Sequence, residues 1–361
     1  MKILVYSKFA DIPRNLLSQC SYPHQPNFFS SADWFQCLFE NSLPENDTLR
    51  AYFVTSDDGT SHVALFCVYA AGTRHLRSLT NFYTTEYAPI EFEETTNANG
   101  AWEALADFIT HERPAWNTIE FRMLHNRDTA NHPLFARLSD AGFFIYQYPL
   151  YDNWFTSVEG TSFDNYYLQL SSRLRNTIRR KSKKLYEIPG AKVRIFHDRY
   201  DDIETGIRDY VEVYNSSWKK PEPHTSFIPS LVKTCCDCGT LLLGVLYVND
   251  RPIAAQLWIC TAAKAVIYKL AYVQDQSDYS PGSILSKALF EVVIEDHKPL
   301  EIDYGVGGEP YKRDWMDGCR SVYVLHGYNT RTAVGLKNTM IHRAKSRFKI
   351  MIDAIGFRSN R

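Results

Sequence analysis

The order of apolar runs repeats in the two halves of this 361-residue chain, and the repetition limits the folds that it can adopt. The second half shows a helical pattern, a strand, another helical pattern, three strand-like runs, a helix and two more strands. The first half follows a similar order. Strands that alternate with helical stretches predict an α/β protein with a mixed sheet, and the repetition predicts two domains of one type.

The joint between the two copies is expected near residues 157–160, which gives an N-terminal domain of residues 1–157 and a C-terminal domain of residues 158–361. The first helix after the joint is expected to begin at a capping box formed by Thr161 and Asp164 and to end before Pro189. The runs "TLLLGVLYV", "PIAAQLWIC" and "AVIYKLAYV" follow with short turns between them, as antiparallel hairpins require. A basic helix from about residue 332 to residue 352 is expected to close the chain.

Composition excludes several classes of protein. The net charge of -1 predicts no global attraction to nucleic acid or to a membrane surface. The start, "MKILVYSKFADIP", lacks the pattern of a signal peptide, and no apolar run reaches the roughly 18 residues of a membrane span. The 8 cysteines have no regular disulfide spacing. We therefore expect a cytoplasmic protein with reduced thiols and no membrane span.

The two copies differ at the entry to one helix. In the second copy, Ser280, Pro281, Gly282 and Ser283 precede a helix. Glycine lets the backbone approach a ligand closely, and free amides at a helix start bind phosphate, although proline at this position is also ordinary capping chemistry. The matching loop of the first copy, "TTEYAPIEFEETTNANG", is long and acidic. A phosphorylated cofactor is therefore expected on the second copy and not on the first.

One helix of the second copy carries seven basic residues and no acidic one. They are Arg173, Arg175, Arg179, Arg180, Lys181, Lys183 and Lys184. Such a run is either a solvated face or a surface for an anionic substrate, carrier or coenzyme phosphates, or nucleic acid. Arg175 and Arg179 lie one helical turn apart, so both can contact one anion.

The stretch "DYGVGGEPYKRDWM" combines glycines with reactive side chains between two apolar runs. Asp303 ends a strand and is a candidate base or amine-positioning group, with a loop cap as the alternative. Tyr311 is a candidate acid or a packed ring. Lys312 holds a phosphate or carboxylate or is a solvated charge, and Trp315 is expected to anchor the loop by packing.

Two polar residues interrupt apolar strands. Gln256 needs hydrogen-bond partners if it is buried, so it either satisfies a bulge or faces the substrate. Strand alternation places Lys269 on the face of Ile267 and opposite Tyr268. An unpaired buried lysine is costly, so Lys269 is expected to be paired or to line a groove.

Motifs for other chemistries are absent from the sequence. Cys235, Cys236 and Cys238 contain a C-x-x-C spacing, but no second pair is placed to complete a zinc site, and His224 is a poor fourth ligand. The sequence also lacks a nucleophile elbow, a Walker loop and a G-x-G-x-x-G fingerprint. We therefore expect no metal and no hydrolase of these types.

Several of these stretches together resemble a known family. The order and spacing of "LSSRLRNTIRRKSKKL", Trp218-Lys219, "RPIAAQLW", "YKLAY", "SPGSIL" and "DYGVGGEPYKRDWM" are similar to those of the CelD-like double-GNAT acyltransferases, relatives of the Fem peptidoglycan aminoacyl transferases. "FFSSADWFQCLF" and "LRSLTNFYTTEYAPI" extend the resemblance to the first half, so it covers nearly the whole chain.

This resemblance implies two tandem GNAT-like domains with an acyl-donor site only in the second. It also implies transfer of an acyl group from a thioester to an amine of a polar, sugar-containing acceptor. The donor is acetyl-CoA, another acyl-CoA or an acyl carrier protein. In the GNAT fold, antiparallel strands that splay apart are expected to offer backbone amides to the thioester carbonyl.

The resemblance also distributes roles among the candidate residues. The catalytic residues are expected to be Asp303 and Tyr311. The donor-binding residues are expected to be Ser280, Gly282, Ser283, Arg175, Arg179 and Lys312. The acceptor-binding residues are expected to be Gln256, Lys269, Tyr272 and Trp218. The family has several glycines in its pyrophosphate loop, whereas Gly282 stands nearly alone here, which leaves coenzyme A, a carrier protein and a charged tRNA open as the acyl carrier.

Two other functions stay open. A Fem-like aminoacyl-tRNA-dependent transferase would use the basic helix for RNA, although the long helical-hairpin insertion common in that group is missing. A non-catalytic GNAT-fold protein would use the same helix to bind nucleic acid or an acidic protein. Apart from these alternatives, nucleic acid is not an expected partner.

Overall fold

The computed structural model describes residues 1–92, 95 and 97–358, with side chains described up to residue 346. The chain divides into two units. Unit 1 comprises residues 1–17, 44–150 and the segment from residue 322 onward, and unit 2 comprises residues 18–43 and 151–321. Each unit therefore contains residues from both halves of the sequence. The boundary expected near residue 157 concerns the two sequence copies and stays a prediction.

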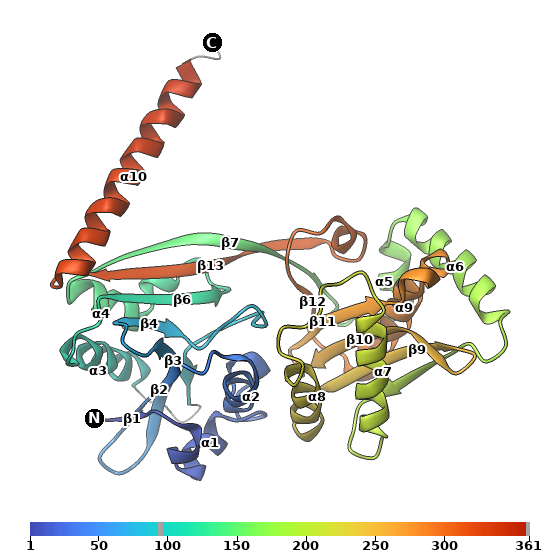
Figure 1. The fold of residues 1–361 in the computed structure, drawn as a ribbon, viewed down its shortest axis with the longest axis horizontal. Helices are drawn as coiled ribbons and strands as arrows, with labels where there is room; N and C mark the ends of the chain where they lie inside the picture. The colour runs from blue at the N-terminus through green and yellow to red at the C-terminus, as the bar shows by residue number, and fades with distance from the viewer. Residues whose placement is uncertain (93–94, 96, 359–361) are drawn as a thin grey trace. The chain divides into compact units, whose positions relative to one another are not determined.

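Unit 1 contains a mixed sheet with the strand order β1-β2-β3-β4-β6-β13 (Figure 1). Its strands are β1 (Lys2–Tyr6), β2 (Asp47–Thr55), β3 (Ser61–Ala70), β4 (His75–Ser78), β5 (Ile90–Glu91), β6 (Thr118–Leu124) and β13 (Gly318–Asn329), with β5 pairing to β3. Its helices are α3 (Ala98–His111), α4 (Pro133–Asp140) and α10 (Ala333–Arg358), and α1 (Arg14–Cys20) begins in it. In the acidic loop before α3, Glu93, Glu94 and Thr96 lie outside the described residues.

Unit 2 contains a second mixed sheet with the order β7-β12-β11-β10-β9-β8 (Figure 1). Its strands are β7 (Phe143–Ser157), β8 (Lys192–Phe196), β9 (Leu241–Val248), β10 (Arg251–Cys260), β11 (Lys264–Tyr272) and β12 (Glu301–Val306). Its helices are α2 (Ala32–Ser42), α5 (Phe163–Gln169), α6 (Ser172–Tyr186), α7 (Ile203–Asn215), α8 (Phe227–Asp237) and α9 (Pro281–Val292). β7 and β13 each contribute residues to both units.

The two sheets repeat one strand order, β1-β2-β3-β4-β6 and β8-β9-β10-β11-β12. In each, the last two strands are parallel and are joined through a helix, α3 or α9. The next strand of each copy is exchanged, because β7 pairs with β12 through residues 153–157 and β13 pairs with β6 through residues 118–124. The repeat confirms the predicted mixed α/β architecture, while the exchange was not predicted.

The helix predicted after residue 161 is two helices. Ser162 caps α5 by accepting a hydrogen bond from the Asn165 amide at 3.3 Å, and Ser171 caps α6 by accepting one from the Leu174 amide at 3.2 Å. Leu170 between them has extended backbone angles. The apolar spacing runs through both helices, so periodicity alone did not reveal the break at the second cap.

Helices cover both faces of the unit 2 sheet. At Gly244 of β9, an added Cβ would lie 2.8 Å from the Leu289 side chain of α9. The neighbouring Leu243 side chain instead approaches Gly206 of α7. Because successive strand residues point to opposite faces, α9 and α7 cover opposite sides of the sheet. α6 packs on α9, and α8 packs on α7.

Residues 18–43 complete the α7–α8 face of unit 2. The buried Trp34 ring of α2 makes an edge contact with Phe227 of α8, with ring centroids 6.0 Å apart, and contacts Tyr268 of β11 at 6.1 Å. Phe29 contacts the same tyrosine at 6.0 Å. Segments that are far apart in the sequence thus build one aromatic core within this unit.

None of the described helices is both long enough and apolar enough to cross a membrane.

We expect Gly244→Val to lower the free energy of unfolding by roughly 1–3 kcal/mol, because the new side chain overlaps Leu289 beneath α9. Urea unfolding followed by circular dichroism measures this. Gly282→Ala is the control, since its Cβ would lie 3.4 Å from Tyr272, which is ordinary contact; its change should stay within about 0.5 kcal/mol. Equal losses in both variants would contradict the packing argument.

Candidate functional site

The parallel strands β11 and β12 separate soon after they meet. They pair only through Lys264–Glu301, Ala265–Ile302 and Val266–Asp303, and β11 then continues to Tyr272 with no described β12 partner. Gly305 of β12 has a φ of 67°, which bends the strand at the separation and favours glycine. The expectation that the splaying strands are antiparallel was therefore wrong, because the two strands that part are parallel.

A bulge in β11 changes which side chains share a face. Leu257 of β10 pairs with Lys269 and Trp258 pairs with Ile267, so Tyr268 is the extra residue. Tyr268 contacts α2, whereas Ile267 lies in the core cluster under α9. Lys269 reaches Glu222, between α7 and α8, at 2.9 Å. The predicted alternation, with Lys269 facing as Ile267 does and opposite Tyr268, was wrong because the bulge interrupts it.

A pocket of about 310 Å³ lies between the separated strands and the start of α9. Its lining residues come from α6, the segment after α7, β10, β11, the turn before α9, α9 itself, β12 and the loop after β12. They are Leu174, Trp218, Gln256, Leu270, Tyr272, Ser277, Ser280, Gly282, Ser283, Ser286, Tyr304, Tyr311, Asp314 and Trp315. We call this set the strand-end pocket. It brings together seven of the predicted site residues: Trp218, Gln256, Tyr272, Ser280, Gly282, Ser283 and Tyr311.

The first turn of α9 presents backbone to this pocket. Ser280 has left-handed angles, with φ 52°, and its side chain makes no capping hydrogen bond. Pro281 has no N–H, and the Ser283 amide donates to the Ser280 carbonyl at 3.1 Å. The Gly282 amide makes no hydrogen bond within the described residues. This amide and the helix dipole favour an anion or a polarised carbonyl at the pocket.

Gln256 holds this turn in place. Its Nε2 donates to the Gly282 carbonyl at 3.0 Å and to the Ser286 hydroxyl at 2.8 Å, and its Oε1 accepts from Trp258 Nε1 at 3.0 Å. The buried amide therefore has partners on both ends. It lines the pocket while it fixes α9 to the sheet.

Tyr304 and Tyr311 line the pocket, and Tyr304 also lies in the core cluster under α9. Their rings meet edge to face, with centroids 5.6 Å apart. Burial raises the pKa of Tyr304 well above its usual range, and the neighbouring Tyr311 adds to this. Burial, followed by the charge of Glu309, raises the pKa of Tyr311 to about 12. Both phenols therefore keep their protons at neutral pH and can donate hydrogen bonds to a group in the pocket.

The loop after β12 is tied to itself by Lys312. This side chain is buried, donates from Nζ to the Val306 carbonyl at 2.7 Å and forms an ion pair with Glu309 at 3.0 Å. Its nitrogen also lies 5.9 Å from the ring of Tyr304, so Lys312 ties the loop to the end of β12, and it does not line the pocket. Trp315 stacks on Phe290 of α9 at 4.9 Å, which is the anchoring role expected for it. The loop is thus fixed at both of its ends.

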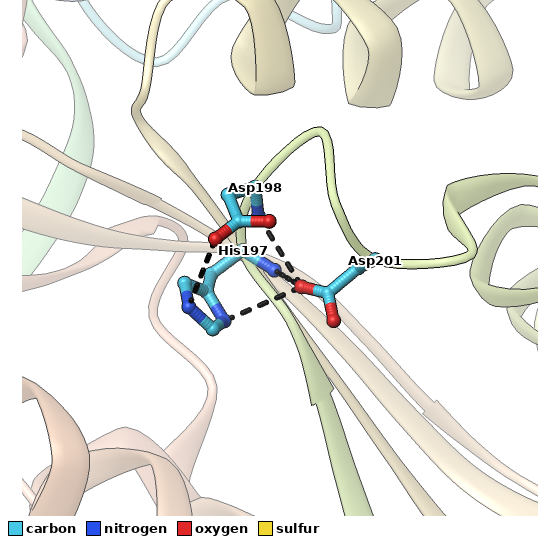
Figure 2. Close-up of side chains that lie close together, drawn as sticks. All are labelled: His197, Asp198 and Asp201. Carbon is cyan, nitrogen blue, oxygen red and sulfur yellow. Dashed lines mark hydrogen bonds and ion pairs between the residues drawn. The ribbon is translucent and has the colours of Figure 1, made fainter.

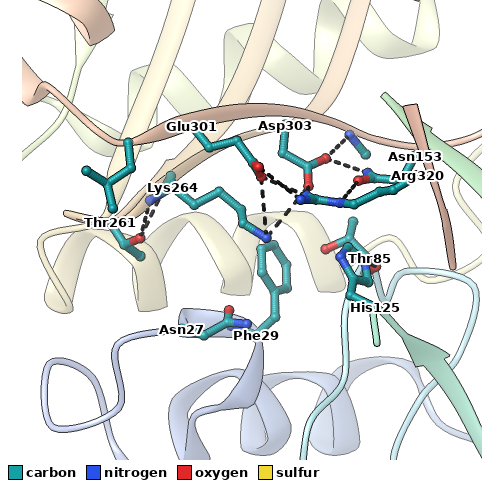
Figure 3. Close-up of polar contacts among 12 residues, drawn as sticks. Asn27, Phe29, Thr85, His125, Asn153, Thr261, Lys264, Glu301, Asp303 and Arg320 are labelled. Atoms are coloured by element: carbon teal, nitrogen blue, oxygen red, sulfur yellow. Dashed lines mark hydrogen bonds and ion pairs between the residues drawn. The ribbon is translucent and has the colours of Figure 1, made fainter. Parts of the chain in front are cut away.

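Asp303 points away from the pocket. Tyr304 lies in the core cluster under α9, so the preceding residue faces the opposite side of the sheet. The Asp303 carboxylate accepts hydrogen bonds from Asn153 at 2.6 Å, from the Gly305 amide at 2.6 Å and from Arg320 at 2.8 Å (Figure 3).

Arg320 extends this network. It donates two hydrogen bonds to Glu301, at 2.9 and 2.7 Å, and one to Asn153 at 2.8 Å. Lys264 Nζ lies 3.8 Å from an oxygen of Glu301 and 3.8 Å from one of Asp303. These contacts hold β12 beside β7. The catalytic role of Asp303 stays a prediction, and its described contacts are those of a structural carboxylate.

The basic run of α6 does not form one face. Lys181 donates to the Asp278 carbonyl, and Lys184 lies 4.8 Å over the Tyr279 ring, so both contact the turn before α9. Arg175 and Arg179 lie roughly half a turn around the helix from these two and line another pocket, between α6 and α9. The predicted donor-binding residues are therefore divided between two pockets.

A lysine beside the strand-end pocket has an altered pKa. Burial lowers the pKa of Lys219 to about 8, and the charge of Lys269 acts in the same direction. Its nitrogen lies 5.9 Å from the ring of Trp218, which lines the pocket and packs on Tyr272 at 4.4 Å. Lys219 therefore exists partly as a free amine near pH 8.

One cluster of described residues has the spacing of a metal site, in the turn before α7. His197 lies between Asp198, at 3.5 Å from Nε2, and Asp201, at 3.4 Å from Nδ1 (Figure 2). The two carboxylates thus face different ring nitrogens, and Asp201 also accepts a hydrogen bond from the His197 amide at 2.8 Å. These contacts close a turn, so we assign the cluster no ligand.

The comparisons with known proteins agree with this geometry. Residues 172–313 match the family described as Acetyltransferase (GNAT) domain, and this range contains most of the strand-end pocket. The crystal structure of FemX is similar to the chain with a TM-score of 0.60 and 10% identity, covering 90% of this chain and 97% of FemX. A conserved protein of unknown function from Bacteroides thetaiotaomicron VPI-5482 has a TM-score of 0.56 and 12% identity, covering 91% and 100%.

No curated protein matched the chain. The family match identifies a GNAT-type domain within residues 172–313, and the similarity to FemX shows a shared fold. Together with the repeated strand order, these findings agree with the predicted mixed α/β fold class. The narrower resemblance to CelD-like proteins stays a prediction.

Sequence reasoning missed two residues beside this site. Tyr304 was passed over in favour of Asp303, although alternation with the apolar Ile302 places Tyr304 on the side of α9. The sequence gives no local sign of a role for Lys219, because its lowered pKa arises from burial and from Lys269, fifty residues later in the chain.

We expect Lys312→Met to lower the free energy of unfolding by about 1–3 kcal/mol, because the Val306 carbonyl and Glu309 lose their partner. Urea unfolding measures the change. Lys192→Met removes an exposed ion pair with Asp250 and should cost at most about 1 kcal/mol. A wild-type stability for Lys312→Met would show that the internal contacts of this lysine do not hold the loop.

Proposed function

We propose that the protein is an N-acyltransferase that moves an acyl group from a thioester donor to the amine of a polar acceptor. The observation that carries this proposal is the separation of β11 from β12 beside a pocket that contains the first turn of α9 and two protonated tyrosines. The GNAT domain match over residues 172–313 supports it.

The residues of the pocket suit each part of the reaction. The acceptor nitrogen attacks the thioester carbonyl carbon, and the Gly282 amide and the free edge of β11 are placed to bind the donor. The carbon–sulfur bond then breaks, and the leaving thiolate accepts a hydrogen bond from Tyr304 or Tyr311 before it takes up the proton that the acceptor amine releases. The acceptor amine must also lose a proton. Lys219 is the base that we propose for it, since its lowered pKa leaves part of it neutral near pH 8.

The helix starts of the two copies support a donor site on the second copy only. In α3 of unit 1, the Asn97 side chain accepts a hydrogen bond from the Gly100 amide at 3.0 Å, so the helix start is already capped. In α9, no side chain caps the corresponding turn. An acyl-CoA or an acyl carrier protein thus has a free amide to bind in unit 2.

A Fem-like transferase that uses aminoacyl-tRNA is the second candidate. It is favoured by the similarity to FemX over 90% of this chain and by the exposed cations on the outer side of α6, Arg173 and Arg180. Such an enzyme should bind aminoacyl-tRNA with a strong salt dependence and should not bind acetyl-CoA.

We expect Gly282→Val to weaken the binding of acetyl-CoA at least tenfold, because the new methyl groups extend toward Tyr272 and into the strand-end pocket. Isothermal titration calorimetry measures the affinity, and circular dichroism checks the fold. Gly282→Ala, which adds only a Cβ in ordinary contact, should retain most of the affinity. An unchanged affinity in the valine variant would remove the donor from this pocket.

A pH–rate series separates the two candidate bases. If Lys219 accepts the proton, kcat/KM rises with pH and levels off near pH 8, because the lysine becomes neutral above its pKa. Lys219→Met should lower the rate at pH 8 by about 10²-fold, and the deficit should shrink at higher pH as the acceptor amine loses its proton unaided. Asp303→Asn should keep the wild-type profile. A lost inflection in Asp303→Asn, with a normal profile in Lys219→Met, would assign the base to Asp303.

A further inference from the structure

A second and larger pocket of unit 2 has no role in the proposed reaction. It is a groove of about 620 Å³ between α6 and α9, and it shares no lining residue with the strand-end pocket. Its walls combine the cations Arg175, Arg179 and Lys287 with apolar and aromatic side chains. We call it the α6–α9 groove.

The cations of the groove are not balanced by its acids. Arg175 Nε donates to the Leu170 carbonyl at 3.1 Å, which turns the guanidinium toward α5. Within residues 1–92, 95 and 97–346, no carboxylate lies within ion-pair distance of Arg175 or Arg179. Lys287 pairs with Glu291 at 3.2 Å, which compensates that one charge. Two guanidinium groups one turn apart therefore face a concave surface without a counter-ion, an arrangement suited to a phosphate.

The rest of the groove is mixed, because apolar side chains lie beside the polar Ser172, Asn176 and Ser182 and the acidic Glu291. Ile178 and Ile284 line it and are buried in the unit 2 core, and Ala288 adds a small side chain. Leu168 is 63% exposed and Tyr186 is 50% exposed at its rim, although burial would stabilise both. Along α6, Tyr186 lies eleven residues beyond Arg175, or roughly 16 Å at 1.5 Å per residue. The groove is thus long as well as partly charged.

We propose that the α6–α9 groove binds an anionic amphiphile, a phosphate monoester of an unbranched apolar chain, at a site separate from the acyl donor. Arg175 and Arg179 bind the phosphate, and the chain lies along Ile178, Ile284 and Ala288 toward Tyr186. Charge complementarity selects the headgroup, and the apolar walls and rim select the chain. A nucleotide would use the two arginines but would leave the far end of the groove empty.

Dodecyl phosphate, used below its micelle concentration, is the probe for this site. In isothermal titration calorimetry it should bind at least tenfold more tightly than inorganic phosphate, and the cationic dodecyltrimethylammonium should not bind. The double variant Arg175→Gln/Arg179→Gln should lose at least tenfold in affinity. Arg180→Gln is the matched control, because Arg180 is an exposed cation of the same helix outside the groove; its affinity should stay at the wild-type value.

A second variant tests the chain separately from the headgroup. Ala288→Phe fills the groove and should weaken dodecyl phosphate at least tenfold while leaving inorganic phosphate unchanged. Equal affinities in the double arginine variant and in Arg180→Gln would overturn the proposal. Binding of adenosine 3′,5′-bisphosphate or of single-stranded RNA at the arginines, without binding of dodecyl phosphate, would overturn it in favour of a nucleotide or nucleic-acid site.

The binding test of the α6–α9 groove can succeed or fail independently of the acyl-transfer proposal. Gly282→Val should keep the wild-type affinity for dodecyl phosphate, since Gly282 does not line the groove. The double arginine variant should conversely keep its affinity for acetyl-CoA. Loss of both ligands in both variants would show one continuous site and would contradict a separate amphiphile site.

Discussion

The short parallel pairing of β11 with β12 is the constraint on which the candidate site depends. Two parallel strands that stayed together would close the space in which Gly282, Tyr304 and Tyr311 meet. Three sets of hydrogen bonds hold the elements around this separation. Gln256 binds the start of α9, and Arg320 binds Glu301 and Asp303 of β12. Lys312 donates a hydrogen bond to the Val306 carbonyl at the end of β12. Each of these contacts is at least partly buried, so breaking it costs more free energy than breaking an exposed contact would.

Near the point where β11 and β12 separate, the side chains on the two faces of the sheet have different roles. Asp303, Glu301 and Arg320 satisfy one another on the α7–α8 face, where they stabilise the position of β12. On the α9 face, the polar groups that line the strand-end pocket are neutral except for Asp314. The lining side chains in the first turn of α9 are uncharged, which suits the proposed binding of a thioester carbonyl at the Gly282 amide.

The sequence predicted much of the fold, and each wrong or missing prediction concerns a particular element. Apolar spacing predicted α6 and α7, because each helix buries one face, and continuous apolar runs predicted β9, β10 and β11, because these strands are buried on both faces of the sheet. α8 was not predicted, although its apolar positions have helical spacing: Phe227, Ile228, Leu231, Val232 and Cys235. Strand alternation misplaced Ile267 relative to Lys269 because a bulge is set by pairing with β10, which no local pattern reveals. The exchange of β7 and β13 likewise depends on long-range pairing alone.

That exchange, together with the placement of residues 18–43 in unit 2, has a consequence for synthesis. On the ribosome, Trp34 and Phe29 emerge long before α8 and β11, the elements that cover them in the folded protein. The sheet of unit 1 likewise cannot be completed before β13 is synthesised, and β13 is near the end of the chain. Neither unit can be completed until almost all of the polypeptide has been made, so the nascent chain carries exposed aromatic surface that a chaperone would recognise.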